Sequence, residues 1–265
     1  MPGLLEGKNV VVMGVANRRS IAWAVARAVL AQGGRLAITY QSRRVRSRVE
    51  RLLADLPNDP AFAQSPSDVP LIECDVAADE GVSRAMKKLA GEMPILHGLV
   101  HSIAYAPADD LQGSFVETTR KGFAVANDIS SYSLIAAARE ARRLMARGGA
   151  IVTMTYAGSH RVVPNYNVMG PAKASLESSV RYLAADLGPA EIRVNAVSAG
   201  PIHTVAARSV KDFAGMLELL QTHTPLRRNV TADEVADAAV FLLSDLSRAI
   251  TGEIVHVDAG AHAVT

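Results

Sequence analysis

Two tyrosines and a lysine in the second half of the chain are the residues best suited to chemistry. Tyr156, Tyr166 and Lys173 follow a short apolar run with the composition of a buried β-strand. A tyrosine hydroxyl can donate a proton, and a lysine side chain carries a positive charge. Ligands bind at the carboxyl edge of open α/β sheets, where a loop and helix after a strand would place these side chains. We therefore treat all three as candidate catalytic residues.

A second candidate site lies near the start of the chain. The first apolar run ends at Gly14, and Ser20 and Ile21 open an apolar helix. A glycine turn beside the N-terminus of a helix presents backbone N–H groups that favour a pyrophosphate. The segment 14–20 lacks the second and third glycines of the G-x-G-x-x-G fingerprint, so a plain strand-to-helix turn remains an alternative.

The residues after the second apolar run bear on which dinucleotide would bind. An acidic residue usually ends this strand and binds the ribose 2′-hydroxyl, but here residues 40–44 read Tyr-Gln-Ser-Arg-Arg. Gln41 can hydrogen-bond a hydroxyl, whereas Arg43 or Arg44 can pair with a 2′-phosphate, so these residues leave NADH and NADPH both open. Asp75, after the third run, is a candidate for contacting the adenine or for capping the next turn.

Short β-branched runs alternate with longer helical patterns along the chain, and this alternation predicts the strands and helices that position these side chains. That rhythm is typical of repeated βα units on a parallel sheet. Strands are expected at residues 9–13, 35–40, 71–74, 98–103, 150–155, 193–198 and 254–257. Helices are expected at residues 20–32, 43–56, 79–91, 123–146, 172–187 and 232–244. We therefore expect an α/β fold, a Rossmann-type doubly wound sheet of seven parallel strands, in a single domain over residues 1–265.

Two segments carry signals of their own. Thr231 is followed three residues later by Glu234, a capping-box pattern that marks the start of the last helix. Residues 203–224 show weak periodicity and follow the breaker Gly200-Pro201. This second pattern predicts a mobile flap.

Composition excludes several classes of protein. With 265 residues, 49% of them hydrophobic and 20% charged, the chain has the balance of a globular protein rather than a disordered or fibrous one. The formal net charge of +2 gives no reason to expect nucleic acid or a membrane surface as a partner. A single cysteine, Cys74, excludes an intrachain disulfide and a multi-cysteine metal site, and no metal is expected. The absence of a signal-peptide pattern and of a long apolar run predicts a cytoplasmic protein.

Several motifs, in order along the chain, resemble those of one enzyme family. They are VMGVAN at 12–17 with SIA at 20–22, HSIAYAP at 101–107, DISSYS at 128–133, PNYNVMG at 164–170 and AGPI at 199–202. Over residues 5–264 the sequence resembles the short-chain dehydrogenases/reductases, and within them the bacterial enoyl-acyl-carrier-protein reductases of the NADH-dependent type. The resemblance implies reduction of the trans-2 double bond of enoyl thioesters on acyl carrier protein, the last reductive step of each fatty-acid elongation cycle.

The spacing between tyrosine and lysine separates this group from carbonyl-reducing relatives. The superfamily resemblance leads one to expect three residues between the pair, whereas six lie between Tyr166 and Lys173. The position four before the lysine is Met169, which cannot donate a proton. If Tyr166 lay on the helix, its hydroxyl would stand three residues, or about 4.5 Å, farther along the helix than the tyrosine of a carbonyl-reducing relative. This position suits an enoyl thioester, because its negative charge develops farther from the carbon that receives the hydride. Pro171 requires the helix to start late, near Asn167, or to be kinked.

The resemblance also implies roles for individual residues. Tyr166 would hold the enolate oxygen, Lys173 would bind the nicotinamide ribose, and Tyr156 would line the substrate pocket as a second catalytic candidate. Ala106 would touch the substrate. The residues implied to contact the dinucleotide are Gly14, Ser20, Ile21, Gln41, Asp75, Val76, Ile103, Lys173, Ile202, His203, Thr204, Val205 and Ala206.

The sequence also bears on the choice of cofactor, on the partners and on two alternative functions. Gln41 matches the NADH-using members of the family, while Arg43 and Arg44 keep NADPH open. The resemblance implies a homotetramer that acts on a thioester bound to acyl carrier protein. One alternative is a short-chain dehydrogenase acting on a ketone or alcohol, and the other is a catalytically inactive nucleotide sensor. Met169 argues against the first, and the three retained candidate catalytic residues argue against the second.

Overall fold

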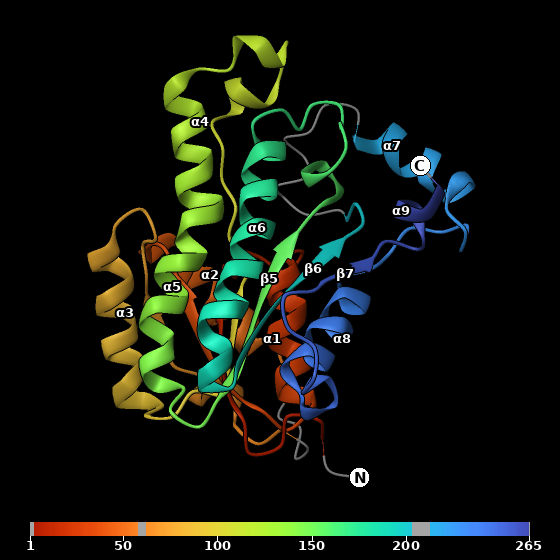
Figure 1. Ribbon diagram of the computed structural model, residues 1–265. Helices are drawn as coiled ribbons and strands as arrows, with labels where there is room; N and C mark the ends of the chain where they lie inside the picture. Colours follow the sequence, from red (N-terminus) through yellow and green to blue (C-terminus); the bar gives the residue numbers. More distant parts are fainter. Residues whose placement is uncertain (1–2, 58–61, 203–212, 265) are drawn as a thin grey trace.

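The strands of the protein run parallel in a single sheet. The computed structural model describes residues 3–57, 62–202 and 213–264. Its strands are β1 (Asn9–Met13), β2 (Arg35–Tyr40), β3 (Leu71–Glu73), β4 (Gly98–His101), β5 (Gly149–Thr155), β6 (Ile192–Ala199) and β7 (Ile254–Val257). The seven strands lie in the order β3-β2-β1-β4-β5-β6-β7, with β1 beside both β2 and β4. The winding therefore reverses between β1 and β4, which confirms the expected Rossmann-type doubly wound fold (Figure 1).

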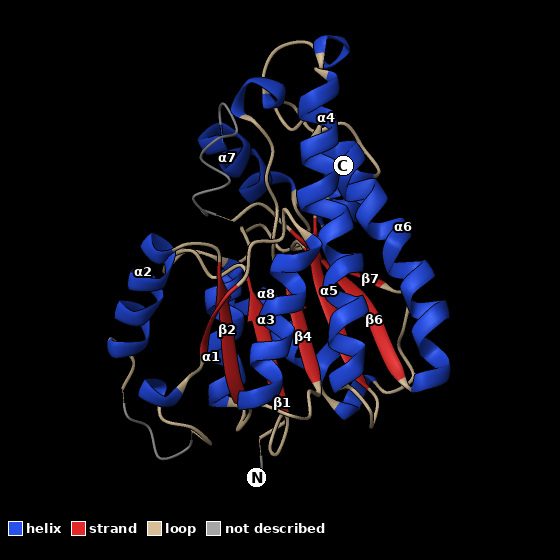
Figure 2. Cartoon of the chain, turned by 90° about the vertical axis from the view of Figure 1, so that its left-hand side faces the viewer, coloured by secondary structure: helices blue, strands red, loops and turns tan. Residues whose placement is uncertain are grey.

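Helices cover both faces of this sheet. They are α1 (Ile21–Ala31), α2 (Arg43–Ala54), α3 (Asp79–Glu92), α4 (Arg120–Asn127), α5 (Ser133–Ala141), α6 (Met169–Leu187), α7 (Phe213–His223), α8 (Ala232–Leu243) and α9 (Ala261–Val264). Helices α1, α2 and α8 pack on one face and α3, α5 and α6 on the other (Figures 1 and 2). Within the described ranges, no helix has the length and apolar character needed to cross a membrane.

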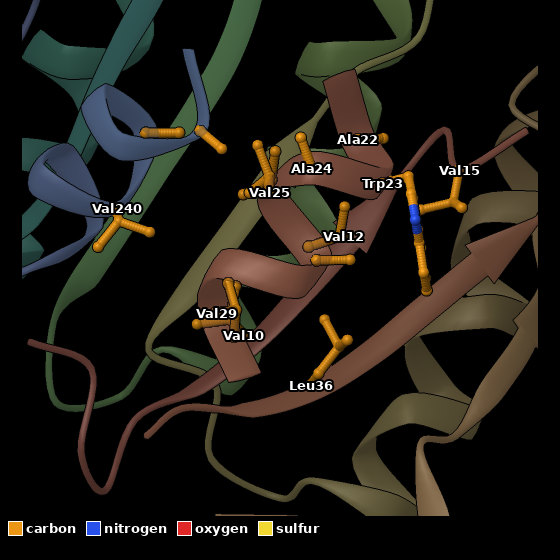
Figure 3. Packing of buried hydrophobic residues seen from close by; sticks show 14 of the residues in the cluster. Val10, Val12, Val15, Ala22, Trp23, Ala24, Val25, Val29, Leu36 and Val240 are labelled. Carbon is orange, nitrogen blue, oxygen red and sulfur yellow. The ribbon is translucent and has the colours of Figure 1, made fainter. Parts of the chain in front are cut away.

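Each central strand sends alternate side chains into two separate hydrophobic cores. On β1, Val10 and Val12 belong to the core beneath α1 and α8, whereas Val11 and Met13 belong to the core beneath α3, α5 and α6. Figure 3 shows part of the first core, in which α1 packs over β1 and β2. Because both faces are covered, the strands are apolar at nearly every position, as a buried parallel sheet requires.

The carboxyl ends of the parallel strands meet at one edge of the sheet, beyond which α4 extends (Figures 1 and 2). Residues that are distant in sequence are therefore brought to one region. They are Gly14 after β1, Gln41 after β2, Asp75 after β3, Ile103 after β4 and Tyr156 after β5. In doubly wound sheets this edge, at the point where the winding reverses, is where ligands bind.

One expected helix is interrupted. The helix predicted at 123–146 consists of α4, a π-helical turn at Asp128–Tyr132, α5 and a 3₁₀ turn at Arg142–Leu144. It also begins earlier than expected, because the Thr119 hydroxyl accepts a hydrogen bond from the Gly122 N–H and so caps α4.

Two further expectations concern the flap at 203–224 and the start of helix α6. Part of the predicted flap at 203–224 is the helix α7, and residues 203–212 lie outside the described residues. Helix α6 begins at Met169 rather than at residue 172, because Pro171 stands in the first turn, where its missing N–H is not needed. The strands agree with the prediction to within two residues at each end.

The predicted capping box at the start of α8 is present. The Thr231 hydroxyl accepts a hydrogen bond from the Glu234 N–H at 3.2 Å, and the Glu234 carboxylate accepts one from the Thr231 N–H at 2.9 Å. Thr231→Ala should lower the free energy of unfolding by about 1 kcal/mol, because it leaves a first-turn N–H without its partner. Urea denaturation measures this change, with Thr231→Ser as the control that keeps the hydroxyl. Equal stabilities of the alanine and serine variants would contradict the capping role.

Candidate active site

Gly14 and the start of α1 form the nucleotide end of the site. Gly14 has a φ of 96° and a side chain there would overlap the carbonyl oxygen of Ser102, so this position requires glycine. Ser20 caps α1 by accepting a hydrogen bond from the Trp23 N–H at 3.3 Å, and the first turn contains no acidic residue. A helix start of this kind favours an anion. The residues present therefore fit the pyrophosphate of a dinucleotide.

The structure brings Gly14 and Ile103 together although they are far apart in sequence. A Cβ atom at Gly14 would lie 3.4 Å from Ile103 Cγ1. The contact exists because Met13 pairs with His101 where β1 and β4 lie side by side. Ile103 thus stands next to the glycine turn, as its predicted contact with the dinucleotide requires.

The residues considered for the adenosine half of the dinucleotide lie along the same edge of the sheet. Gln41 is exposed directly after β2, and Arg43 and Arg44 are exposed in the first turn of α2. Asp75 is exposed after β3, and its Oδ1 atom accepts a hydrogen bond from the Ala77 N–H at 3.1 Å. The capping alternative for Asp75 is therefore observed, and its contact with adenine stays a prediction.

The remaining cofactor candidates are apolar or lie outside the described residues. Ile21 and Ile202 are half-buried against the core beneath α1 and α8, and Val76 is buried in the other core. Across the described residues, no group of three or more His, Cys, Asp or Glu side chains is arranged to hold a metal ion. The candidates outside the described residues are His203, Thr204, Val205 and Ala206.

Tyr166 lies in a turn before α6 and not on the helix, which begins three residues later. Its neighbours Asn165 and Asn167 have positive φ angles of 59° and 33°, a region that asparagine enters more readily than most residues. These two residues keep the chain out of the helical conformation around Tyr166. The expected displacement of the tyrosine along a helix is therefore wrong, since its position is set by the turn.

Tyr166 is held from two sides. Its ring meets that of Tyr156 edge to face, with the ring centroids 5.0 Å apart and the ring planes at 69°. Gly158 lies against the same ring, and a Cβ atom there would lie 2.7 Å from Tyr166 Cε1. Withdrawal from water raises the pKa of the Tyr166 phenol well above its usual range, and Tyr156 and the charge of Glu177 raise it further. Tyr166 is therefore a neutral hydrogen-bond donor.

Lys173 projects from the first turns of α6 toward the end of β5. Its side chain is buried, and its Nζ atom donates a hydrogen bond to the Met154 carbonyl oxygen at 2.8 Å. Burial lowers the pKa of Lys173 to about 8, and the negative charge of Glu177 opposes this shift. An ammonium group has three N–H donors, so the bond to Met154 leaves two for the hydroxyl groups of a ligand.

Met169 fills the position four residues before Lys173. It is 6% exposed and packs with Ala172 in a small apolar cluster beneath α4. Ala106 and Tyr166 pack against this cluster as partly buried residues. The structure therefore places the predicted substrate residue Ala106 and Tyr166 against the same cluster. It also places a thioether where a carbonyl-reducing relative would carry its tyrosine.

A buried histidine beneath the site went unrecognised in the sequence. His101, at the end of β4, is fully buried, and its ring nitrogens lie 2.9 Å from the Thr153 hydroxyl and 2.8 Å from the Ser133 hydroxyl. Burial and the nearby charge of Lys173 lower the pKa of His101 to about 3, so its ring is neutral. This residue joins β4 to β5 and to α5.

The π-helical turn before α5 supplies a second set of polar contacts. Ser130 accepts a hydrogen bond from the Tyr105 N–H at 2.9 Å, and the hydroxyl of Ser131 lies 2.9 Å from that of Ser175 on α6. Turns of this type are frequent at functional sites. The sequence signal that points to it is a run of serines inside a helical pattern, since serine competes with helical hydrogen bonding.

The comparisons agree with this geometry. The family described as Enoyl-(Acyl carrier protein) reductase matches residues 14–262. The chain is 50% identical to the enoyl-acyl-carrier-protein reductase (NADH) FabI of Bacillus cereus, over 98% of each chain. It is 47% identical to the corresponding NADH enzyme of Escherichia coli, over 97% of this chain and 95% of that one. It is also 48% identical to the enoyl-acyl-carrier-protein reductase (NADPH) FabI of Staphylococcus aureus, over 98% of each chain.

Solved structures show the same relationship. The crystal structure of the Bacillus cereus enoyl-acyl carrier protein reductase with NADP+ and indole naphthyridinone has a TM-score of 0.94 to this protein, at 49% identity and with 99% of each chain covered. The structure of the enzyme from Aquifex aeolicus has a TM-score of 0.90 at 46% identity, with 98% of each chain covered. The family match spans both the nucleotide edge and the tyrosine turn. The chain therefore belongs to the enoyl-acyl-carrier-protein reductase family.

Proposed function

We propose that this protein uses NADH to reduce the trans-2 double bond of enoyl thioesters carried by acyl carrier protein, in the last reductive step of fatty-acid elongation. The observation that carries the proposal is the pair Tyr166 and Met169. The hydroxyl donor stands in the turn before α6, and a buried thioether fills the position nearer Lys173. A ketone needs its proton donor beside the carbon that receives the hydride, whereas an enoyl thioester needs it at an oxygen farther along the conjugated chain. The names of the relatives support the same reaction.

The described residues at the sheet edge are suited to hold the dinucleotide. Gly14, Ser20 and Ile21 would hold its pyrophosphate, and Gln41 would bind the adenosine ribose. Lys173 would bind the nicotinamide ribose through the two donors that Met154 leaves. When bound, the nicotinamide supplies the hydride for Cβ of the substrate. The residues assigned to the adenine and to the nicotinamide end are Asp75, Val76, Ile103, Ile202, His203, Thr204, Val205 and Ala206.

Tyr166 holds the thioester oxygen while negative charge develops on it. Its raised pKa keeps the phenol protonated and therefore able to donate, and one donor of this kind contributes about 10²–10³ in rate. The ammonium of Lys173 stabilises the same charge from nearby. Tyr166 or solvent then delivers the proton to Cα. Tyr156 supports the Tyr166 ring and lines the substrate pocket, and Ala106 contacts the substrate.

Assembly, location and the flap belong to the same proposal. The family resemblance supports a cytoplasmic homotetramer whose segment 203–224 closes over the substrate. Closure would exclude water from the enolate and so strengthen the hydrogen bond from Tyr166.

An assay with two substrates tests the proposed reaction. The loss of NADH absorbance is followed with crotonyl-CoA, an enoyl thioester, and with acetoacetyl-CoA, a ketoacyl thioester. The proposal expects turnover with the first and little with the second. Preference for the ketoacyl thioester would identify a carbonyl reductase instead. Binding of NADH without turnover of either substrate would identify an inactive nucleotide sensor.

Removing the Tyr166 hydroxyl tests the oxyanion role. Tyr166→Phe should lower kcat at least about 10-fold with little change in the Kd of NADH, because the lost donor faces the substrate and not the nucleotide. Steady-state kinetics and NADH titration by fluorescence measure the two quantities. Tyr182→Phe, on the exposed face of α6, is the matched control. Wild-type turnover in Tyr166→Phe would exclude the assignment.

Gly158→Ala tests whether the close packing beneath the tyrosine matters. The added methyl group would overlap the Tyr166 ring and displace it from the substrate. We expect a loss of kcat of about 10-fold or more, since small misplacements of catalytic groups are costly. The control is Gly91→Ala on α3, where a Cβ atom meets nothing within 4 Å. Equal rates for Gly158→Ala and the wild type would show that the ring tolerates displacement.

The cofactor preference is tested by comparing kcat/KM for NADH and NADPH. A 2′-phosphate needs a fixed basic partner, whereas a 2′-hydroxyl needs only a neutral group such as Gln41. Arg43 and Arg44 are exposed at the start of α2, so NADH should be preferred. A preference for NADPH of about tenfold or more, lost on replacing both arginines with alanine, would show instead that they bind the ribose phosphate.

A further inference from the structure

Two charged side chains of α6 hold the end of β5. Glu177 follows Lys173 by four residues, so the two side chains lie on one face of the helix, one turn apart. Lys173 donates its hydrogen bond to the Met154 carbonyl oxygen at 2.8 Å, and the next residue, Thr155, donates its hydroxyl to Glu177 Oε1 at 2.6 Å. Both bonds therefore connect α6 to consecutive residues of β5.

This pair of bonds lies directly beside the reacting groups. Thr155 is 4% exposed, so its hydroxyl has little access to water and depends on Glu177 for its hydrogen bond. The next residue is Tyr156, whose ring meets that of Tyr166. A shift of the end of β5 relative to α6 would therefore move both tyrosines relative to Lys173.

The negative charge of Glu177 also acts on Lys173. Lys173 also interacts electrostatically with His101 from β4, which is neutral, and the charge of Glu177 acts on Tyr166 from the turn between β5 and α6. The negative charge of Glu177 favours the ammonium form of Lys173 and disfavours the phenolate form of Tyr166. The charge of Glu177 also acts on His256 of β7, which stacks on His262 with ring centroids 4.2 Å apart.

We propose that Glu177 is a positioning residue for the reaction: its carboxylate holds Thr155 at the end of β5 and places a negative charge one helical turn from Lys173. The inference rests on the proposed enoyl reduction, because it concerns the groups assigned to that reaction. It assigns two separable effects to one side chain. The hydrogen bond positions the tyrosines, and the charge favours the ammonium form of the lysine.

Two variants separate these effects. Glu177→Gln keeps a hydrogen-bond acceptor for Thr155 and removes the charge, whereas Thr155→Val removes the hydroxyl and keeps the charge. Asp186→Asn, on an exposed part of α6, is the control for a carboxylate of the same helix. Each protein is compared by its pH profile of kcat/KM and by NMR titration of lysine side chains labelled with ¹³C at Cε. The Lys173 signal is assigned by its loss in Lys173→Met.

The signs of the expected shifts are fixed by the charges. Lys173 has its pKa lowered to about 8, so it is charged below that pH and neutral above it. In Glu177→Gln the titration of Lys173 and the alkaline limb of kcat/KM should both move down by about 1 pH unit or more, because an opposite charge has been removed. Thr155→Val should lower kcat several-fold without moving either curve downward, and Asp186→Asn should match the wild type.

The readouts distinguish failure of the inference from failure of the proposed function. A Lys173 titration in Glu177→Gln that coincides with that of the wild type would overturn the charge effect, whatever the activity. An undiminished kcat in Thr155→Val would overturn the positioning effect. A wild-type protein without enoyl reduction would overturn the proposed function and, with it, the role given to Glu177.

Discussion

The close approach of the Tyr166 ring to the backbone at Gly158 is the contact on which the rest of the site depends. No side chain larger than hydrogen fits between them. The ring can reach this position because Asn165 and Asn167, on either side of it, adopt positive φ angles and keep the tyrosine out of the helix. Tyr156 then closes the arrangement from the other side. A residue outside any helix is thereby packed from two sides.

The sheet provides the frame for this turn. Two hydrophobic cores fix helices on both faces of the parallel strands, so the ends of β5 and α6 have a defined relation. Hydrogen bonds from Lys173 to Met154 and from Thr155 to Glu177 connect α6 to the end of β5. His101 ties the end of β4 to the same region through neutral hydrogen bonds. The buried charge of the lysine is therefore accompanied by one carboxylate and by neutral neighbours, which suits a site where negative charge must appear on a substrate.

The sequence predicts the frame better than the site. Strand positions and the capping box at Thr231 follow from local patterns, because β-branched runs and caps are encoded by adjacent residues. The turn around Tyr166 is not predicted by the sequence, because the positive φ angles of Asn165 and Asn167 leave no periodic signal. His101 resembles any other strand residue until the fold places Thr153 and Ser133 beside it. Contacts between residues that are distant in sequence leave no regular spacing from which they could be predicted.

The central claim is that Tyr166, from a turn outside α6, holds the substrate oxygen while Met169 stays in the core. A crystal structure of the protein with NADH and an enoyl thioester analogue tests it most directly. The expected result is a hydrogen bond of about 2.7 Å from the Tyr166 hydroxyl to the thioester oxygen, with Lys173 on the nicotinamide ribose and the turn unchanged. A thioester oxygen bound by Tyr156 or by water alone, with Tyr166 turned away, would contradict the claim.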